Sequence, residues 1–206
     1  IGTTGSRGLH HILWELVDNA IDEAANGYAS FVEIELGRDG TVTVTDDGRG
    51  IPVGIHEKHG VSGVELVFTQ LHAGGKFGND SYGYSGGLHG VGASVVNALS
   101  SYLRAEVFTQ GRAYMQEFEP QVDSSGKLHP GRPKAPLKEV VRKRKQGTVV
   151  TFKPDDSVFE RTELDSEMVS RRMRELAYIK RGIIIRLRVS RMLKREAAHC
   201  ISRGST

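Results

Sequence analysis

The chain has 206 residues, of which 38% are hydrophobic and 26% charged, and its formal net charge is +3. This length fits one domain of α/β or α+β type with a sizeable core, and so small a positive excess does not by itself indicate a nucleic-acid-binding protein. The single cysteine excludes an internal disulfide. No apolar run is long enough to span a membrane and no signal segment opens the chain, so we expect a soluble, cytoplasmic domain.

The first expected element is an amphipathic helix over residues 9–26, with Ser6 able to cap its start and Gly27 its end. Apolar residues at three- and four-residue steps predict its buried face: Leu9, Ile12, Leu13, Leu16, Val17, Ala20, Ile21 and Ala24. Opposite them runs a row of polar side chains four residues apart and without Lys or Arg: His11, Glu15, Asn19 and Glu23. Such a row indicates either a site for a hard cation with oxygen ligands or an acidic, solvent-exposed face.

A β-hairpin is expected next, because residues 31–36 and 41–45 alternate between apolar and polar side chains around a turn at Arg38-Asp39-Gly40. The second strand leads directly into the sequence DDGRGIP at residues 46–52. Two acids and two glycines at a strand end favour a place where the backbone approaches a ligand closely. On their own, the two acids are more typical of a plain turn.

A second amphipathic helix is expected over residues 61–71. It is followed by the stretch 73–92 (AGGKFGNDSYGYSGGLHGVG), which contains eight glycines. A loop of this length inside a compact domain is either functional or disordered. Because a third helix over residues 90–100 would open at the end of the glycines, its free N–H groups predict an anion-binding site.

The remaining elements follow from alternation, turn residues and helical periodicity. In chain order they are a hairpin of 103–109 and 112–119, a surface excursion over 120–136, a hairpin of 137–144 and 148–153 around Gln146-Gly147, a helix over 163–179, a strand over 183–189 and a loosely ordered tail over 190–206.

Three familiar nucleotide-binding signatures do not fit. A Walker loop needs Ser or Thr after its Gly-Lys pair, and here Phe77 follows Gly75-Lys76. The dinucleotide fingerprint needs a strand before its glycines, whereas a polar loop precedes Gly90. The protein-kinase motifs are missing.

Four blocks in order resemble the N-terminal ATPase domain of bacterial type II topoisomerases, the gyrase B or topoisomerase IV ParE subunit of the GHKL superfamily. They are ELVDNAIDE at 15–23, DDGRGIP at 46–52, GGLHGVG at 86–92 and Gly147-Thr148. The sequence LHAGGKF at 71–77 favours the topoisomerase branch, and the opening residues lean towards gyrase B. The resemblance covers residues 1–189 and implies an α+β two-layer sandwich, with a mixed, largely antiparallel sheet and helices packed on one face.

The resemblance implies ATP and Mg²⁺ as ligands. It makes Glu15 the general base that draws a proton from the attacking water, with His11 orienting it. Asn19 would offer its side-chain oxygen to Mg²⁺ at the phosphates. His11 has the alternative interpretation of an ordinary surface histidine.

The same resemblance assigns the adenine pocket. Asp46 would accept a hydrogen bond from the adenine amino group, and Thr148 would support the same edge. Arg49 would pair with Glu23 and cover the open side of the base. Close backbone approach and apolar walls would come from Gly50, Ile51, Pro52 and Val67.

The glycine-rich stretch is implied to be a lid that is mobile when empty and ordered by nucleotide. Tyr82 would touch the adenine side. The residues expected to wrap the phosphates are Gly74, Gly75, Lys76, Leu88, His89, Gly90, Val91 and Gly92.

The implied function is ATP-driven closure of a dimer clamp, coupled to DNA strand passage together with a gyrase A-type subunit. The chain begins without Met, and it lacks the family's N-terminal arm and transducer domain, so we expect a mainly monomeric fragment with low turnover. Aminocoumarin-type inhibitors are candidate ligands, although Thr109 stands where the family often has an arginine, unless the alignment shifts to Arg112.

Three other interpretations stay open at this point. One is the ParE subunit, and another is a chaperone-like or mismatch-repair-like ATPase of the same superfamily that gates a protein partner. The last is a basic nucleic-acid-binding module that uses residues 142–145 and the basic third long helix.

Overall fold

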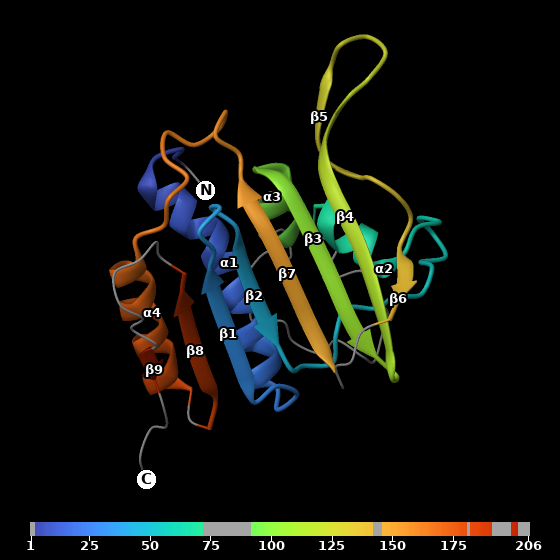
Figure 1. Cartoon of the computed structure of the whole chain (residues 1–206). Helices are drawn as coiled ribbons and strands as arrows, with labels where there is room; N and C mark the ends of the chain where they lie inside the picture. Colours follow the sequence, from blue (N-terminus) through green and yellow to red (C-terminus); the bar gives the residue numbers. More distant parts are fainter. Residues whose placement is uncertain (1–2, 72–91, 142–145, 181, 191–198, 202–206) are drawn as a thin grey trace.

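The computed structural model describes residues 3–71, 92–141, 146–180, 182–190 and 199–201. These residues form a mixed sheet with helices against one face (Figure 1). The helices are α1 (Ser6–Ala25), α2 (Gly63–Thr69), α3 (Gly92–Ala98) and α4 (Ser166–Ile179). The strands are β1 (Phe31–Leu36), β2 (Val42–Asp46), β3 (Ser100–Thr109), β4 (Arg112–Val122), β5 (Leu128–Pro133), β6 (Lys138–Val140), β7 (Gly147–Pro154), β8 (Ile184–Val189) and β9 (His199–Ile201).

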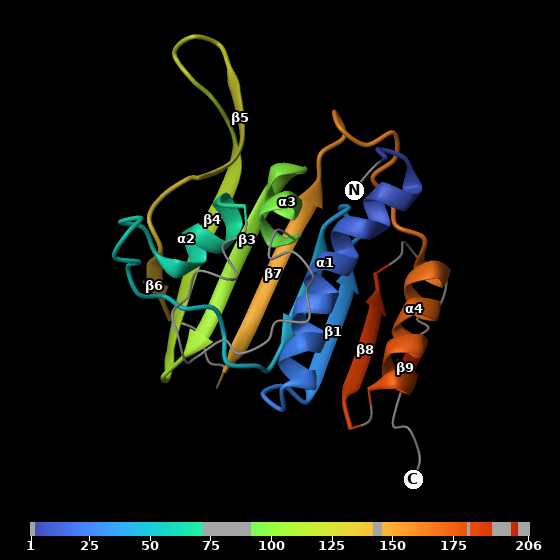
Figure 2. The same ribbon diagram turned by 180° about the vertical axis from the view of Figure 1, so that it is seen from behind.

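The strand order is β5-β4-β3-β7-β2-β1-β8-β9, and β6 also pairs with β4. The pair β1–β8 is parallel, and the other pairs of the described strands are antiparallel. Seen from behind, α1, α2 and α3 lie across the sheet, and α4 lies at its β8 end (Figure 2). The expected α+β two-layer fold with helices on one face is therefore confirmed.

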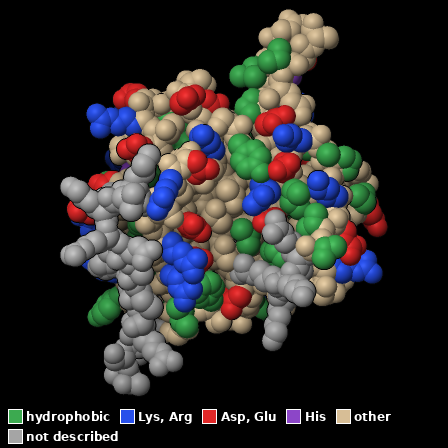
Figure 3. All heavy atoms as spheres, in the orientation of Figure 1, with side chains coloured by type: hydrophobic (Ala, Val, Ile, Leu, Met, Phe, Trp, Pro, Cys, Tyr) green, Lys and Arg blue, Asp and Glu red, His purple; other side chains and the backbone are tan. Residues whose placement is uncertain are grey.

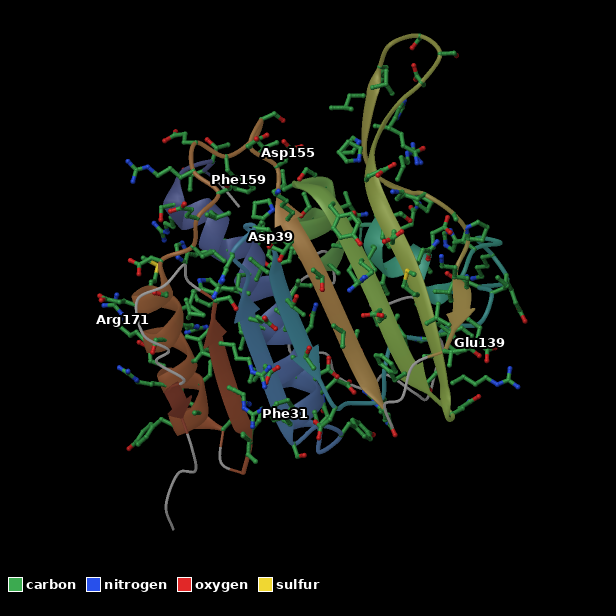
Figure 4. The ribbon with its side chains drawn as sticks, in the orientation of Figure 1. Phe31, Asp39, Glu139, Asp155, Phe159 and Arg171 are labelled. Atoms are coloured by element: carbon green, nitrogen blue, oxygen red, sulfur yellow. The ribbon has the colours of Figure 1, made fainter. Side chains whose placement is uncertain are left out.

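The core fills the space between the helices and the sheet. The apolar face expected for α1 is buried from Leu9 to Ile21, and alternate residues of β1 (Val32, Ile34 and Leu36) are buried opposite it. Apolar periodicity alone determines these faces, because side chains alternate across a strand and repeat every three to four residues on a helix. The connection from β7 to α4 closes one end of the core with the buried Phe159, close to Asp155 (Figure 4).

The opposite face of the sheet is open and carries charges of both signs between apolar side chains (Figure 3). There Glu33 pairs with Arg186 at 3.2 Å and with Arg188 at 3.4 Å. The Arg186 guanidinium also lies 5.2 Å from the centre of the Phe31 ring, which is labelled at the end of β1 in Figure 4. None of the described helices is both long and apolar enough to cross a membrane.

Two local features near the chain start and at the sheet edge differ from the sequence prediction. Ser6 does not cap α1: the cap position is Gly5, and Ser6 is already helical, with its carbonyl accepting from the ring of His10. The expected surface excursion 120–136 is largely the end of β4 and the strand β5, joined by a turn in which Asp123 accepts hydrogen bonds from Ser125 and Lys127. Its Pro, Gly and Ser residues mark an edge strand and a turn instead of an irregular loop.

The expected hairpin around Gln146-Gly147 is also wrong. Residues 138–140 form β6, which pairs with β4, whereas β7 inserts between β3 and β2. A Gln-Gly pair indicates a local turn but carries no information on which strand becomes the partner. Within the expected loose tail 190–206, His199–Ile201 pairs with β8, and residues 191–198 and 202–206 lie outside the described part.

Candidate functional site

The polar row of α1 lies at the centre of the candidate site. His11 Nδ1 is 3.4 Å from Glu15 Oε1, so the two side chains expected to act together do meet. Asn19, one turn further on, is exposed, and Glu23 turns to the loop after β2. The four side chains therefore face a shared surface but make different contacts.

The end of the glycine-rich stretch reaches this row. A Cβ at Gly92 would overlap Glu15 Oε2 and lie 3.0 Å from Glu15 Cβ. Only glycine allows α3 to begin this close to a carboxylate, because any side chain would occupy the same volume. The expected meeting of α1 with the glycine-rich stretch is thus observed at Gly92. The other expected lid residues, namely Gly74, Gly75, Lys76, Tyr82, Leu88, His89, Gly90 and Val91, lie outside the described residues.

Asp46 is an acid in a position that the strand pattern assigns to an apolar residue. It follows Val42 and Val44 on the helix-covered face of β2 and is only 8% exposed. Thr148 on β7 is its cross-strand partner and is equally buried. A buried carboxylate and a buried hydroxyl side by side provide hydrogen-bonding groups in an otherwise apolar layer, which is the pattern of a specific polar ligand site.

The adjacent acid, Asp47, has a structural role. Its carboxylate accepts hydrogen bonds from Ser30 N at 2.7 Å, Ser30 Oγ at 2.6 Å and Phe31 N at 2.8 Å. Burial by itself raises the pKa of Asp47, but these hydrogen bonds outweigh it and bring the pKa below its usual value. The plain-turn interpretation therefore describes Asp47, whereas Asp46 points to the inner face, where its Oδ1 accepts from Gly48 N at 2.9 Å.

The loop after β2 carries the expected ion pair. Arg49 Nη2 lies 2.6 Å from Glu23 Oε1, and Arg49 Nε lies 3.1 Å from Glu23 Oε2. The backbone N–H of Arg49 also donates to Glu23 Oε2 at 3.0 Å. Three hydrogen bonds to one carboxylate fix the entire loop on the last turns of α1.

The following residues line the same end of the sheet. A Cβ at Gly50 would lie 3.0 Å from Val107 Cγ1, so the loop backbone rests on β3. Ile51 and Val67 are partly buried against the core, and the carbonyl of Pro52 packs on Gly63 at the start of α2. These contacts form the floor and an apolar wall beside Asp46, as the sequence predicted.

The acidic character of α1 has an electrostatic consequence. Burial raises the pKa of Asp18 above its usual value; Arg172 of α4 opposes the rise, Glu15 adds to it, and His11 opposes it. Among the described residues, no group of three or more His, Cys, Asp or Glu side chains is arranged as a metal site. Mg²⁺ needs only one or two protein ligands when phosphate oxygens supply the others, so the exposed Asn19 amide beside Glu15 fits such a shared site.

One residue of this region was not predicted. The ring of Tyr28 lies under the Arg49 guanidinium, with Arg49 Cζ 3.6 Å from the ring centre. An aromatic residue just after a helix has no periodic signal of its own, so only the three-dimensional arrangement reveals this contact. The basic run 142–145 lies outside the described residues, so the interpretation as a nucleic-acid-binding module has no structural support from it.

Comparisons with known proteins agree with this geometry. The family model described as histidine kinase-, DNA gyrase B-, and HSP90-like ATPase matches residues 4–158. The DNA gyrase B protein of Clostridium acetobutylicum is 48% identical over 199 residues, which cover 97% of this chain and 30% of that protein. The corresponding B-type chain of the type 2 topoisomerase of Aquifex aeolicus is 52% identical over 179 residues, 87% of this chain and 21% of that protein.

A solved structure is similar as well. The 43K ATPase domain of Thermus thermophilus gyrase B, crystallised in complex with an aminocoumarin, matches with a TM-score of 0.76 and 37% identity, over 92% of this chain and 45% of that chain. The chain spans less than a third of the length of the gyrase and topoisomerase proteins to which it is similar.

Proposed function

The chain belongs to the family of histidine kinase-, DNA gyrase B- and HSP90-like ATPases, and on this premise we propose that it binds ATP at the end of β2 and β7 and hydrolyses the terminal phosphate. The observation that carries the proposal is the buried Asp46–Thr148 pair, a polar cross-strand pair in a layer that is otherwise apolar.

Adenine recognition is assigned to this pair. The Asp46 carboxylate accepts a hydrogen bond from the exocyclic amino group of adenine, and Thr148 supports the same edge. Guanine presents a carbonyl oxygen where adenine presents this amino group, so an ionised acceptor disfavours it. Gly50, Ile51, Pro52 and Val67 enclose the base, and Arg49 with Glu23 covers its open side.

Hydrolysis is assigned to the polar row of α1. Glu15 holds the attacking water and accepts its proton, and His11 at 3.4 Å orients the Glu15 carboxylate. Asn19 is the side chain that would hold Mg²⁺, whose charge would neutralise the phosphate oxygens as the bond breaks. Phosphoryl transfer to water depends mainly on positioning and charge, so a row of three side chains on one rigid helix suits it.

The glycine-rich stretch is assigned to the phosphates. Its residues Gly74, Gly75, Lys76 and 88–92 would supply N–H groups and one ammonium, and Tyr82 would touch the adenine. Gly92 against Glu15 supports this assignment, because it brings the end of the stretch to the proposed water site.

In the whole protein we propose that this domain drives a gyrase-B-type subunit: ATP closes a dimer clamp on DNA, and hydrolysis resets it with a gyrase A-type partner. The similarity to gyrase B proteins supports this role. Aminocoumarins are proposed ligands because the similar Thermus thermophilus domain was crystallised with one. Thr109 pairs directly with Arg112 across the β3–β4 turn, so Arg112 stands near the place where the family often has its arginine.

Titration with the non-hydrolysable analogue AMPPNP, with and without Mg²⁺, tests the proposal. We expect Asp46→Asn to bind roughly 10- to 100-fold more weakly, the value of a hydrogen bond to a charged group. Asp156→Asn is the matched control, since it removes an exposed carboxylate next to Asp155, at the other end of the sheet (Figure 4).

Glu15→Ala is expected to keep AMPPNP binding and to lose turnover in the full-length protein. Equal affinity for the guanine analogue GMPPNP, or unchanged binding by Asp46→Asn, would contradict the adenine assignment.

A further inference from the structure

The Arg49 guanidinium is held from two directions. In its plane, Glu23 accepts two hydrogen bonds, from Nη2 at 2.6 Å and from Nε at 3.1 Å. Against its face lies the ring of Tyr28, whose centre is 3.6 Å from Arg49 Cζ. A carboxylate in the plane and an aromatic ring on the face are the two arrangements in which a guanidinium interacts most favourably.

Tyr28 is itself placed by the end of α1. Its backbone N–H donates to the carbonyl of Glu23 at 2.9 Å, which sets the ring beside the helix terminus. Glu23 therefore bonds Tyr28 through its carbonyl and Arg49 through its carboxylate. The three residues form one unit, which we call the Arg49 clamp (Glu23, Tyr28 and Arg49).

We propose that Tyr28 is a positioning residue, which orders the Arg49 guanidinium over the nucleotide site before the nucleotide arrives. An arginine side chain loses considerable rotamer freedom when it is held in one geometry. The ring and the carboxylate remove that freedom in the free protein, so less is lost on binding and affinity rises. The inference rests on the proposed function in one respect, namely that Arg49 covers the bound base.

The contribution of the ring is limited because Tyr28 is 49% exposed and the Arg49 side chain is 24% exposed. A cation–π contact of this kind corresponds to an affinity change of about two- to fivefold. The ring face carries the effect, and the hydroxyl has no part in it. Tyr28→Phe should therefore behave as the wild type, and Tyr28→Leu should not.

Two measurements on the same variants test the inference. The first is NMR of the Arg49 side chain in the nucleotide-free protein: protons above a ring face are shifted upfield by the ring current. We expect this shift in the wild type and in Tyr28→Phe, and its loss in Tyr28→Leu. The second is AMPPNP affinity, which we expect to fall two- to fivefold in Tyr28→Leu only. Tyr178→Leu, which removes an 87% exposed tyrosine from α4, is the matched control.

A double-mutant cycle separates positioning from direct contact. If Tyr28 acts through Arg49, Tyr28→Leu has no further effect on affinity in an Arg49→Ala background. An equal loss in both backgrounds would overturn the inference, and so would Arg49 resonances that do not respond to Tyr28→Leu.

Failure of the proposed function would look different. Asp46→Asn would then bind AMPPNP as the wild type does. The NMR comparison in the nucleotide-free protein would still decide whether the ring orders Arg49.

Discussion

The carboxylate of Glu15 lies directly against Gly92, the first residue of α3, so that a methyl group at position 92 would overlap Glu15 Oε2. The proposed general base and the end of the glycine-rich stretch are therefore fitted to each other. This contact leads to the first prediction. We expect Gly92→Ala to displace the Glu15 carboxylate and to lower kcat at least tenfold, since a shift of about 1 Å at a reacting group is sufficient for such a loss.

The Gly92→Ala measurement is steady-state ATPase in the full-length protein, with a thermal melt to show that the domain still folds. The control is Gly54→Ala, because a Cβ there meets nothing within 4 Å. Turnover by Gly92→Ala equal to that of Gly54→Ala would rule out this role of the close contact.

Gly147 gives a second prediction, about the strand pair that carries Asp46 and Thr148. Its φ is +125°, and a Cβ would overlap the Asp46 carbonyl oxygen and lie 2.9 Å from the Cα of Asp47. We expect Gly147→Ala to force β2 and β7 apart, which lowers both the melting temperature and AMPPNP affinity. Gly111→Ala is the comparison, because Gly111 also has positive φ but has open space around it. A similar loss in both variants would attribute the effect to backbone strain alone.

A third prediction concerns pH and Asp47. The hydrogen bonds from Ser30 and Phe31 outweigh burial, so the folded-state pKa lies below that of the unfolded chain. A lowered carboxyl pKa stabilises the fold above the unfolded pKa of about 4, and this stabilisation is lost as the pH falls through the folded value. Asp47→Asn should therefore destabilise the protein at pH 7 and differ less from the wild type near pH 3.

Urea denaturation across this pH range measures the effect for Asp47→Asn. Asp156→Asn controls for the loss of one negative charge. A destabilisation by Asp47→Asn that is the same at both pH values would contradict the assignment.

A fourth prediction addresses His10, which joins the start of α1 to the start of α4. Its ring is 1% exposed; Nδ1 lies 2.7 Å from the Ser6 carbonyl oxygen, and Nε2 accepts from the N–H of Asp165 at 3.0 Å. These contacts place the proton on Nδ1. His10→Leu keeps the volume but leaves a buried carbonyl and a buried N–H without these partners, so we expect a loss of roughly 1–3 kcal/mol in the free energy of unfolding.

Chemical denaturation provides that number for His10→Leu, with the exposed His59→Leu as the control. Stability equal to that of the control would show that the two hydrogen bonds contribute nothing measurable.

Much of the site was predictable because its parts are close in sequence. The row on α1 follows from a four-residue spacing, and the pairing of Arg49 with Glu23 and of His11 with Glu15 was expected and is observed. The separate roles of Asp46 and Asp47 were not predictable. Adjacent residues of a strand point to opposite faces, but only the packed helices show that the face of Asp46 is the covered one.

The sequence by itself determined which residues lie on one helix face or one strand face, because these periodicities are local properties of the backbone. The tertiary structure alone decided that β7 lies between β2 and β3, which places Thr148 beside Asp46. It also decided that the ring of Tyr28 lies under Arg49. Strand partners and ring contacts are selected by the packing of the entire domain, and a turn such as Gln146-Gly147 is compatible with more than one partner.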